Sequence, residues 1–282
     1  MNNTVIRSLS GALFLVIMTG SLLLSPVIFA LVMMVSTLVM MKEYLNISLG
    51  KQYKIGTIIS IISGLVLYTL FYIVYALGAN PNLLWIMVFP LSSIFISALY
   101  EKNEKGEVRK EGYINSSFLI VAIVYIALPF SLTNTILFDS TGGYTPKLLL
   151  SMFIMLWSAD VGAYVFGMAF GQKRGHKLYP AISPKKSWEG FFGGMLSTLI
   201  TAVILQICGL ISFPTAHTIA ISLLIFIFGV FGDLVESLLK RNFGVKDSGT
   251  IMPGHGGLLD RFDGALIAFP VAIAYIQLFG LI

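Results

Sequence analysis

Long apolar segments alternate with short polar ones along almost the whole chain. A helix needs about 20 mostly apolar residues to cross a hydrocarbon core of about 30 Å. Nine segments approach this length, at residues 8–24, 27–46, 55–77, 83–100, 114–131, 148–170, 189–211, 217–239 and 262–281. The pattern therefore predicts nine transmembrane helices, of which the first two are separated only by a break at Ser25 and Pro26.

The composition is typical of an integral membrane protein. Hydrophobic residues make up 57% of the 282 positions and charged residues only 11%, whereas soluble proteins carry about 25% charged residues. No polar stretch is long enough to form a separate soluble domain, so we expect an all-α polytopic membrane protein with one continuous membrane domain. The single cysteine, Cys208, excludes a disulfide bond within the chain and a cysteine metal cluster.

The formal net charge of +5 would suit a nucleic-acid partner, but the basic residues lie in loops between the apolar segments. If the segments alternate in direction, all 18 Lys and Arg residues except Lys147 fall on one side. Basic loops of membrane proteins face the cytoplasm, so we expect a cytoplasmic N-terminus and no nucleic-acid partner. The loops after the second and fourth segments also carry acids that alternate with lysines, which we interpret as a solvated face: Glu43, Glu101, Glu104, Glu107 and Glu111.

Other carboxylates lie inside the apolar segments, where charge is costly and usually faces a polar cavity or a partner. A helical period places Asp233 and Glu236 on one face of the eighth segment, together with Ser237 and Lys240. Asp160 lies within the sixth segment. We expect these polar faces to surround a shared cavity that opens to the cytoplasm.

Carboxylate oxygens are the ligands that Mg²⁺ prefers, usually one or two of them together with water and substrate phosphate. Asp260 and Asp263 are three residues apart at the start of the last apolar segment, and with Asp233 they form the predicted metal site. The alternative is structural, since a carboxylate in a helix bundle can pair with Lys or Arg. Glu236 and Asp263 can also act one step away from the metal, by holding a lysine or a water.

The loop before the seventh apolar segment combines bases with helix-start signals. It contains Ser183, Lys185, Lys186 and Ser187, directly before the predicted helix. Backbone N–H groups at a helix N-terminus bind anions, and neighbouring lysines add positive charge. A triphosphate or a lipid phosphate fits such a loop. The alternative is a basic interfacial loop that touches anionic lipid head groups.

The most informative stretch is residues 237–263, SLLKRNFGVKDSGTIMPGHGGLLDRFD, a charged and glycine-rich segment between two apolar runs. His255 between two glycines is suited to donate to a phosphate or to shuttle a proton. The chain has no P-loop pattern and no His pair with zinc spacing, so a P-loop NTPase and a zinc site are excluded.

This stretch resembles the signature of the phosphatidate cytidylyltransferases, also called CDP-diacylglycerol synthases. The matching positions are Ser237, Lys240-Arg241, Lys246-Asp247, Gly249, Pro253, His255-Gly256-Gly257, Asp260-Arg261 and Asp263. Met252 is a departure, because the family usually has Leu, Ile or Phe there. Two further stretches also resemble the family, Ser158-Ala159-Asp160 and Ser183-Pro184-Lys185-Lys186-Ser187. The first 145 residues or so match only in being apolar spans.

The resemblance implies the reaction CTP + phosphatidate → CDP-diacylglycerol + pyrophosphate. It implies Mg²⁺ as the cofactor, with or without a second, monovalent cation such as K⁺, and a homodimer in the lipid bilayer. Residues 1–146 would then supply scaffold helices and dimer contacts, and residues 147–282 the catalytic region. The location expected is the inner membrane, with the active site facing the cytoplasm.

For this reaction, we hypothesise a role for each candidate site residue. Asp233 and Asp260 would hold the metal, and Asp263 would complete its shell or orient Arg261. The phosphate-binding bases would be Lys240, Arg241 and Lys246, while Gly254, Gly256 and Gly257 would let the backbone approach the nucleotide. The remaining site residues are Asp160, Ser183, Lys185, Lys186, Ser187, Ser237, Asp247 and His255.

Two other functions stay open on the sequence. A CTP-dependent lipid kinase would transfer the γ-phosphoryl group to a lipid alcohol. A cation-coupled secondary transporter would use the intramembrane acids to bind its coupling ion. Such transporters often contain internal repeats, and none is evident in this chain.

Overall fold

The computed structural model describes residues 3–50, 53–101, 111–139, 141–171, 176–254 and 256–282, and most of these residues are helical. Internal contacts group the chain into two compact units. The first unit comprises Met1–Tyr144 and Asp247–Arg261, and the second comprises Thr145–Lys246 and Phe262–Ile282. The segment resembling the family signature is thus divided between the units, with its glycine-rich part in the first.

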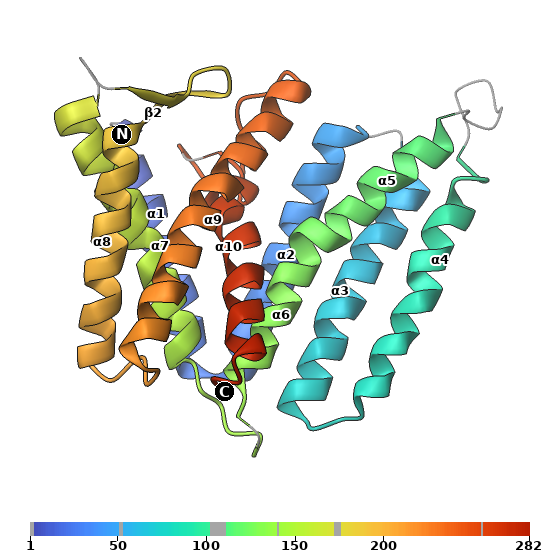
Figure 1. The fold of residues 1–282 in the computed structure, drawn as a ribbon. Helices are drawn as coiled ribbons and strands as arrows, with labels where there is room; N and C mark the ends of the chain where they lie inside the picture. Colours follow the sequence, from blue (N-terminus) through green and yellow to red (C-terminus); the bar gives the residue numbers. More distant parts are fainter. Residues whose placement is uncertain (1–2, 51–52, 102–110, 140, 172–175, 255) are drawn as a thin grey trace. The chain divides into compact units, whose positions relative to one another are not determined.

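The first unit is built from antiparallel helices joined by short connections (Figure 1). In chain order they are α1 (Asn3–Leu24), α2 (Pro26–Ser48), α3 (Lys54–Ala76), η1 (Pro81–Met87), α4 (Val88–Ser97), α5 (Gly112–Ala122), η2 (Ile123–Ala127) and α6 (Leu128–Leu137). Ser25 is extended and Pro26 follows at the first position of α2. Because proline is favoured at the first position of a helix and disrupts the hydrogen bonds of a helix interior, this pair separates α1 from α2.

The core of the first unit lies between α2, α3 and the continuous α5–η2–α6 segment. Fully buried side chains include Met41 and Tyr68, and Gly64 of α3 lies directly against Met41. Many apolar side chains on the other faces are exposed, among them Leu13 and Val16 of α1. Exposed apolar faces of this extent fit helices that are surrounded by lipid.

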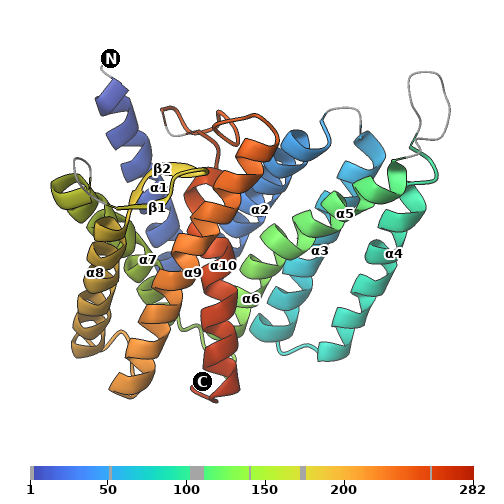
Figure 2. The ribbon, with the colours of Figure 1, turned by 45° about the horizontal axis from the view of Figure 1, so that its top comes forward.

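The second unit contains four long helices and one small hairpin in the described residues (Figure 2). Its elements are α7 (Lys147–Phe166), η3 (Gly167–Gly171), β1 (Lys177–Tyr179), β2 (Ser183–Ser187), α8 (Trp188–Ile207), α9 (Thr215–Asn242) and α10 (Leu259–Leu278). The first three residues of α10 belong to the first unit. The strands pair antiparallel, with Lys177 opposite Ser187 and Tyr179 opposite Ser183.

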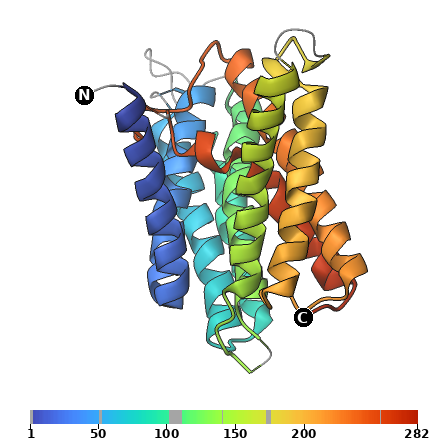
Figure 3. The ribbon, with the colours of Figure 1, turned by 90° about the vertical axis from the view of Figure 1, so that its left-hand side faces the viewer.

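Glycines allow the helices of the second unit to approach closely. Figure 3 shows α7 and α8 side by side, in agreement with their many contacts. A Cβ atom on Gly190 would lie 2.8 Å from the carbonyl oxygen of Ala163, and one on Gly194 would lie 2.9 Å from that of Ala159. Likewise, a Cβ atom on Gly162 would lie 2.8 Å from the carbonyl oxygen of Gly193. Small residues at the contact between two membrane helices typically allow such a close approach.

The all-α polytopic prediction is confirmed. In the described residues, 7 helices are long and apolar enough to cross a membrane, and a shorter apolar helical stretch covers Pro81–Ser97. The ninth predicted segment is α10, which begins at Leu259 and carries Asp260 in its first turn. The fourth predicted span, residues 83–100, departs from the prediction, because it is split between η1 and the short helix α4. The β1–β2 hairpin was not predicted, because its short polar strands show no alternation of apolar residues.

Candidate active site

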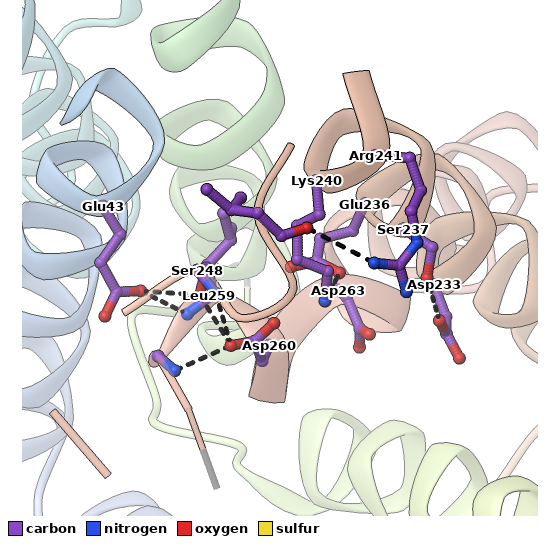
Figure 4. A network of polar contacts seen from close by, with 12 residues as sticks. Glu43, Asp233, Glu236, Ser237, Lys240, Arg241, Ser248, Leu259, Asp260 and Asp263 are labelled. Atoms are coloured by element: carbon purple, nitrogen blue, oxygen red, sulfur yellow. Dashed lines mark hydrogen bonds and ion pairs between the residues drawn. The ribbon is translucent and has the colours of Figure 1, made fainter. Parts of the chain in front are cut away.

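Polar side chains pair along one face of the C-terminal part of α9. This part is the end of the eighth apolar segment, which the sequence predicts to face the cytoplasm. The hydroxyl of Ser237 donates to Asp233 Oδ1 at 3.2 Å, and Lys240 Nζ lies 2.5 Å from Glu236 Oε2 (Figure 4). Glu236 is fully buried. Each pair is one helical turn apart, as the helical period predicted. Glu236 therefore holds a lysine, which is one of the two roles left open for it.

A third carboxylate, from α10, lies near these two. Asp263 is close enough to Asp233, Glu236 and Asp160 for their negative charges to act on it. Its Oδ1 atom accepts a hydrogen bond from the N–H of Gly264 at 2.7 Å. Carboxylates from α7, α9 and α10 thus lie near one another in the second unit.

Bare glycine backbone makes this arrangement possible. A Cβ atom on Gly232 of α9 would collide with the carbonyl oxygen of Asp263 and would lie 2.9 Å from the Cα atom of Gly264. The two helices therefore cross in contact one residue before Asp233 and one residue after Asp263. This crossing brings the two carboxylates together without any side chain between the backbones.

The hairpin supplies the cation that pairs with the carboxylates. Lys186 Nζ of β2 lies 2.6 Å from Asp233 Oδ2. The side chains keep 24% and 39% of their exposure, respectively, so the pair remains reachable from solvent. Lys185 is exposed and Ser183 is partly buried. Arg241, near the end of α9, is exposed and donates to the carbonyl oxygen of Val245 at 3.5 Å.

Local hydrogen bonds hold the hairpin on the start of α8. The Ser187 hydroxyl caps the helix by accepting from the N–H of Gly190 at 3.2 Å. Glu189 Oε1 accepts from the N–H of His176 at 3.0 Å, which ties the beginning of the hairpin to α8. These bonds keep Lys186 in place and direct it toward Asp233, since β2 runs straight into the helix.

The glycine-rich part of the signature segment folds around Asp260. Asp260 Oδ2 accepts two hydrogen bonds from Ser248, one from its backbone N–H and one from the Ser248 hydroxyl, each at 2.9 Å (Figure 4). It accepts a third from the N–H of Gly257 at 2.7 Å. Gly256 has a φ of +87°, a value that L side chains rarely adopt. The carboxylate thus gathers backbone donors from both ends of the loop.

Two acids of the expected solvated face are instead buried, so that prediction is wrong for them. Glu43 of α2 is 9% exposed and accepts hydrogen bonds from Leu258 and Leu259 in the signature segment. Glu101 is 4% exposed and accepts from the N–H of Gly56 at 3.0 Å. Both lie beside lysines at the ends of apolar segments, and their partners are too distant in sequence for any local pattern to reveal them. Glu111 is exposed, as expected.

The comparisons extend the likeness far beyond the signature segment. A family model described as the cytidylyltransferase family matches residues 5–279. The chain belongs to the cytidylyltransferase family. Proteins named phosphatidate cytidylyltransferase from Staphylococcus epidermidis (strain ATCC 35984) and Staphylococcus aureus (strain COL) are each 32% identical to it over 270 residues. Those alignments cover 94% of this chain and 96% of each relative.

Other predicted site residues of this cytidylyltransferase have solvent-exposed side chains. They are Asp160, Lys185, Lys246, Asp247 and Arg261. Gly254 has a φ of +75° and lies against the side chain of Arg7. His255 lies outside the described residues, so its catalytic role stays a prediction.

The donor chemistry of the site fits the cation expected for a cytidylyltransferase. Among the described residues, no group of three or more His, Cys, Asp or Glu side chains is arranged to hold a metal ion. Mg²⁺, however, is commonly bound by one or two carboxylates, with water and substrate phosphate completing its shell. Asp233 and Asp263 provide such a pair of hard oxygen donors in the second unit.

Proposed function

We propose that this protein is a phosphatidate cytidylyltransferase, which makes CDP-diacylglycerol and pyrophosphate from CTP and phosphatidate. The observation that carries the proposal is the match of nearly the whole chain to relatives of that name. The carboxylates of α9 and α10 beside Lys186 support it, because this chemistry needs a charged site for phosphates at a membrane. The comparisons give no support to the lipid kinase or the transporter.

In the reaction, an oxygen of the phosphatidate phosphate forms a bond to the α-phosphorus of CTP. The bond from this phosphorus to the bridging α–β oxygen breaks, and pyrophosphate leaves with the electron pair. The attacking phosphate is already an anion near neutral pH, so no strong general base is required. Because two anions must meet, positioning and charge neutralisation provide most of the rate.

Asp233 and Asp263 would hold Mg²⁺, which when bound offsets negative charge on the phosphates and on the leaving group. Lys186 pairs with Asp233 and is exposed enough to bind a phosphate oxygen of the substrate. Glu236 keeps Lys240 in a fixed position beside the carboxylates. The prediction that Asp260 also binds the ion stays a prediction, and its hydrogen bonds support a role in organising the signature loop.

The residues of the hairpin are suited to bind one group of substrate phosphates. Ser183, Lys185 and Lys186 lie on β2, and Ser187 caps α8 directly after them. The end of α9 suits another, because Lys240 and Arg241 lie in its last turn and Arg can bind two phosphate oxygens at once. The acyl chains would remain in lipid, CTP would arrive from the cytoplasm, and the enzyme would act as a homodimer in the inner membrane.

The test uses purified protein in detergent with phosphatidate and CTP labelled in the cytidine, with and without Mg²⁺. We expect a labelled lipid and free pyrophosphate, formed only when Mg²⁺ is present. In a parallel assay with a lipid alcohol as the acceptor, formation of unlabelled lipid phosphate together with labelled CDP would instead support the lipid kinase. Nucleotide-independent cation-coupled uptake into proteoliposomes, without any labelled lipid, would support the transporter.

A further inference from the structure

The carboxylate of Glu43 in α2 is bound by one distant part of the chain. Its Oε1 accepts from the N–H of Leu258 at 3.0 Å, and its Oε2 accepts from the N–H of Leu259 at 2.8 Å and from the hydroxyl of Ser248 at 3.3 Å. These donors are more than 200 positions along the chain from Glu43. In the described part of the chain, no basic residue forms an ion pair with Glu43.

These contacts place a negative charge at the start of α10. The first N–H groups of a helix have no partner within it, and the helix dipole favours an anion there. Hydrogen bonds from backbone N–H groups to a carboxylate are charge-assisted and therefore strong. Glu43 thus caps α10 from another helix, and the first two turns of α10 carry Asp260 and Asp263.

Ser248 links Glu43 to Asp260. Its hydroxyl lies 3.3 Å from Glu43 Oε2 and 2.9 Å from Asp260 Oδ2. A serine hydroxyl has one hydrogen to donate, so the two carboxylates share it. Asp260 also accepts from the backbone N–H groups of Ser248 and Gly257, and keeps these bonds whichever carboxylate receives the hydroxyl hydrogen.

The carboxylate of Glu43 also explains why two positions of the loop are glycines. A Cβ atom on Gly249 would collide with Glu43 Oε1. One on Gly257 would collide with the Ser248 hydroxyl and would lie 2.7 Å from Glu43 Oε2. The loop can wrap around Glu43 only because both positions lack a side chain.

We propose that Glu43 is a positioning residue for cytidylyl transfer: it fixes the signature loop and the start of α10, and through Ser248 it orients Asp260. This role rests on the proposed function. It gives α2 a part in holding the signature loop, although residues 1–146 contain no recognisable signature. Glu43 itself touches no reacting atom in this role.

The experiment compares Glu43→Gln and Glu43→Asp with Glu101→Gln in the full-length protein. Glu101 is the matched control, because it is also a buried acid that accepts an N–H from the first turn of a helix, but it does not contact the signature segment. We expect Glu43→Gln to lower kcat about 10- to 100-fold, the usual range for a residue that supports a metal site, with a much smaller change in the KM for CTP. Glu43→Asp keeps the charge and should restore part of the rate.

Hydrogen exchange provides a readout that does not depend on turnover. In Glu43→Gln, peptides covering residues 247–259 should exchange faster than in the wild type, while in Glu101→Gln they should be unchanged. If the wild type makes no CDP-lipid, the proposed function fails and this exchange measurement still tests the contact. Unchanged exchange, or a kcat loss no greater than that of Glu101→Gln at equal folded protein, would overturn the positioning role.

A second variant covers the case in which Glu43→Gln does not fold. Ser248→Ala removes the shared hydroxyl and leaves the backbone bonds to Asp260 in place. We expect it to lower kcat, and we expect its effect to be less than additive with that of Glu43→Asp, because both act on the same carboxylate. Full activity of Ser248→Ala, or strictly additive effects of Ser248→Ala and Glu43→Asp on kcat, would contradict the proposal that Glu43 orients Asp260 through Ser248.

Discussion

Lys186 and Asp233 neutralise each other across 2.6 Å, and both remain partly exposed. Glu236 and Lys240 form a similar pair that is almost completely buried. The difference in exposure indicates different roles, since a buried pair fixes geometry whereas an accessible pair can exchange its partners. We therefore expect substitution of Lys186 to affect substrate binding, and substitution of Glu236 to affect the fold.

Replacing Lys186 tests the accessible pair. Lys186→Met should lower kcat/KM for CTP about 10- to 100-fold, because a phosphate loses its charged partner and Asp233 loses its counter-charge. Lys177→Met is the control, since Lys177 is in the same hairpin but forms no ion pair among the described residues. Equal activity of the two variants would exclude a role for Lys186 in binding.

Replacing Asp260 tests the organisation of the signature loop. Asp260→Asn should nearly abolish turnover while the protein still inserts and purifies, because an amide lacks the charge that attracts the donors of Ser248 and Gly257. Asp139→Asn, in an exposed turn, should retain wild-type activity in the same labelled-lipid assay. Wild-type turnover by Asp260→Asn would contradict both the metal and the loop-organising roles.

At the scale of elements, close packing of α7 on α8 supports the hairpin and its lysines. Gly194 lies against the Ala159 carbonyl and against the ring of Phe226 in α9, so it fills a junction of three helices. Gly20 in α1, by contrast, has nothing within 4 Å of an added Cβ atom. Substituting each of these two helical glycines with alanine therefore distinguishes the effect of packing on stability from the effect of helix propensity.

Gly194→Ala should destabilise the protein by about 1–3 kcal/mol, the usual effect of overpacking, and should lower the midpoint of thermal inactivation in detergent. Gly20→Ala should leave the midpoint unchanged or raise it slightly, because alanine is the better helix former. A midpoint for Gly194→Ala at or above that of the wild type would show that the contact between α7 and α8 is looser than described.

Local sequence patterns predicted the elements better than their connections. The length of the apolar segments predicted the membrane helices. The signature segment was recognised because its charged residues and glycines are close in sequence. The contact of Glu43 with Leu258 was missed, because a buried cap supplied by another helix leaves no periodic signal. The β1–β2 hairpin was missed because its strands are short and polar.

At the scale of the whole molecule, the family match includes residues 5–279, so it covers the helices before the signature segment as well. Nearly all basic residues are expected on the cytoplasmic side, and Lys147 at the start of α7 is the exception. The hairpin precedes α8 and Cys208 follows it, so the two should lie on opposite sides of the membrane.

This orientation can be measured with the single native cysteine. Cys208 is exposed, and a membrane-impermeant maleimide should label it in right-side-out vesicles and not in inside-out vesicles. In a Cys208→Ser background, Lys185→Cys should show the reverse pattern. Labelling of Cys208 only from the cytoplasmic side would invert the proposed topology.

The most direct test of cytidylyl transfer at the carboxylate cluster compares CTP labelled at the α-phosphorus with CTP labelled at the γ-phosphorus, using the wild type and Asp263→Asn. The wild type should place α-label in the lipid and release γ-label as pyrophosphate, and Asp263→Asn should do neither while remaining folded. Transfer of γ-label to lipid, or unimpaired α-label transfer by Asp263→Asn, would contradict the account.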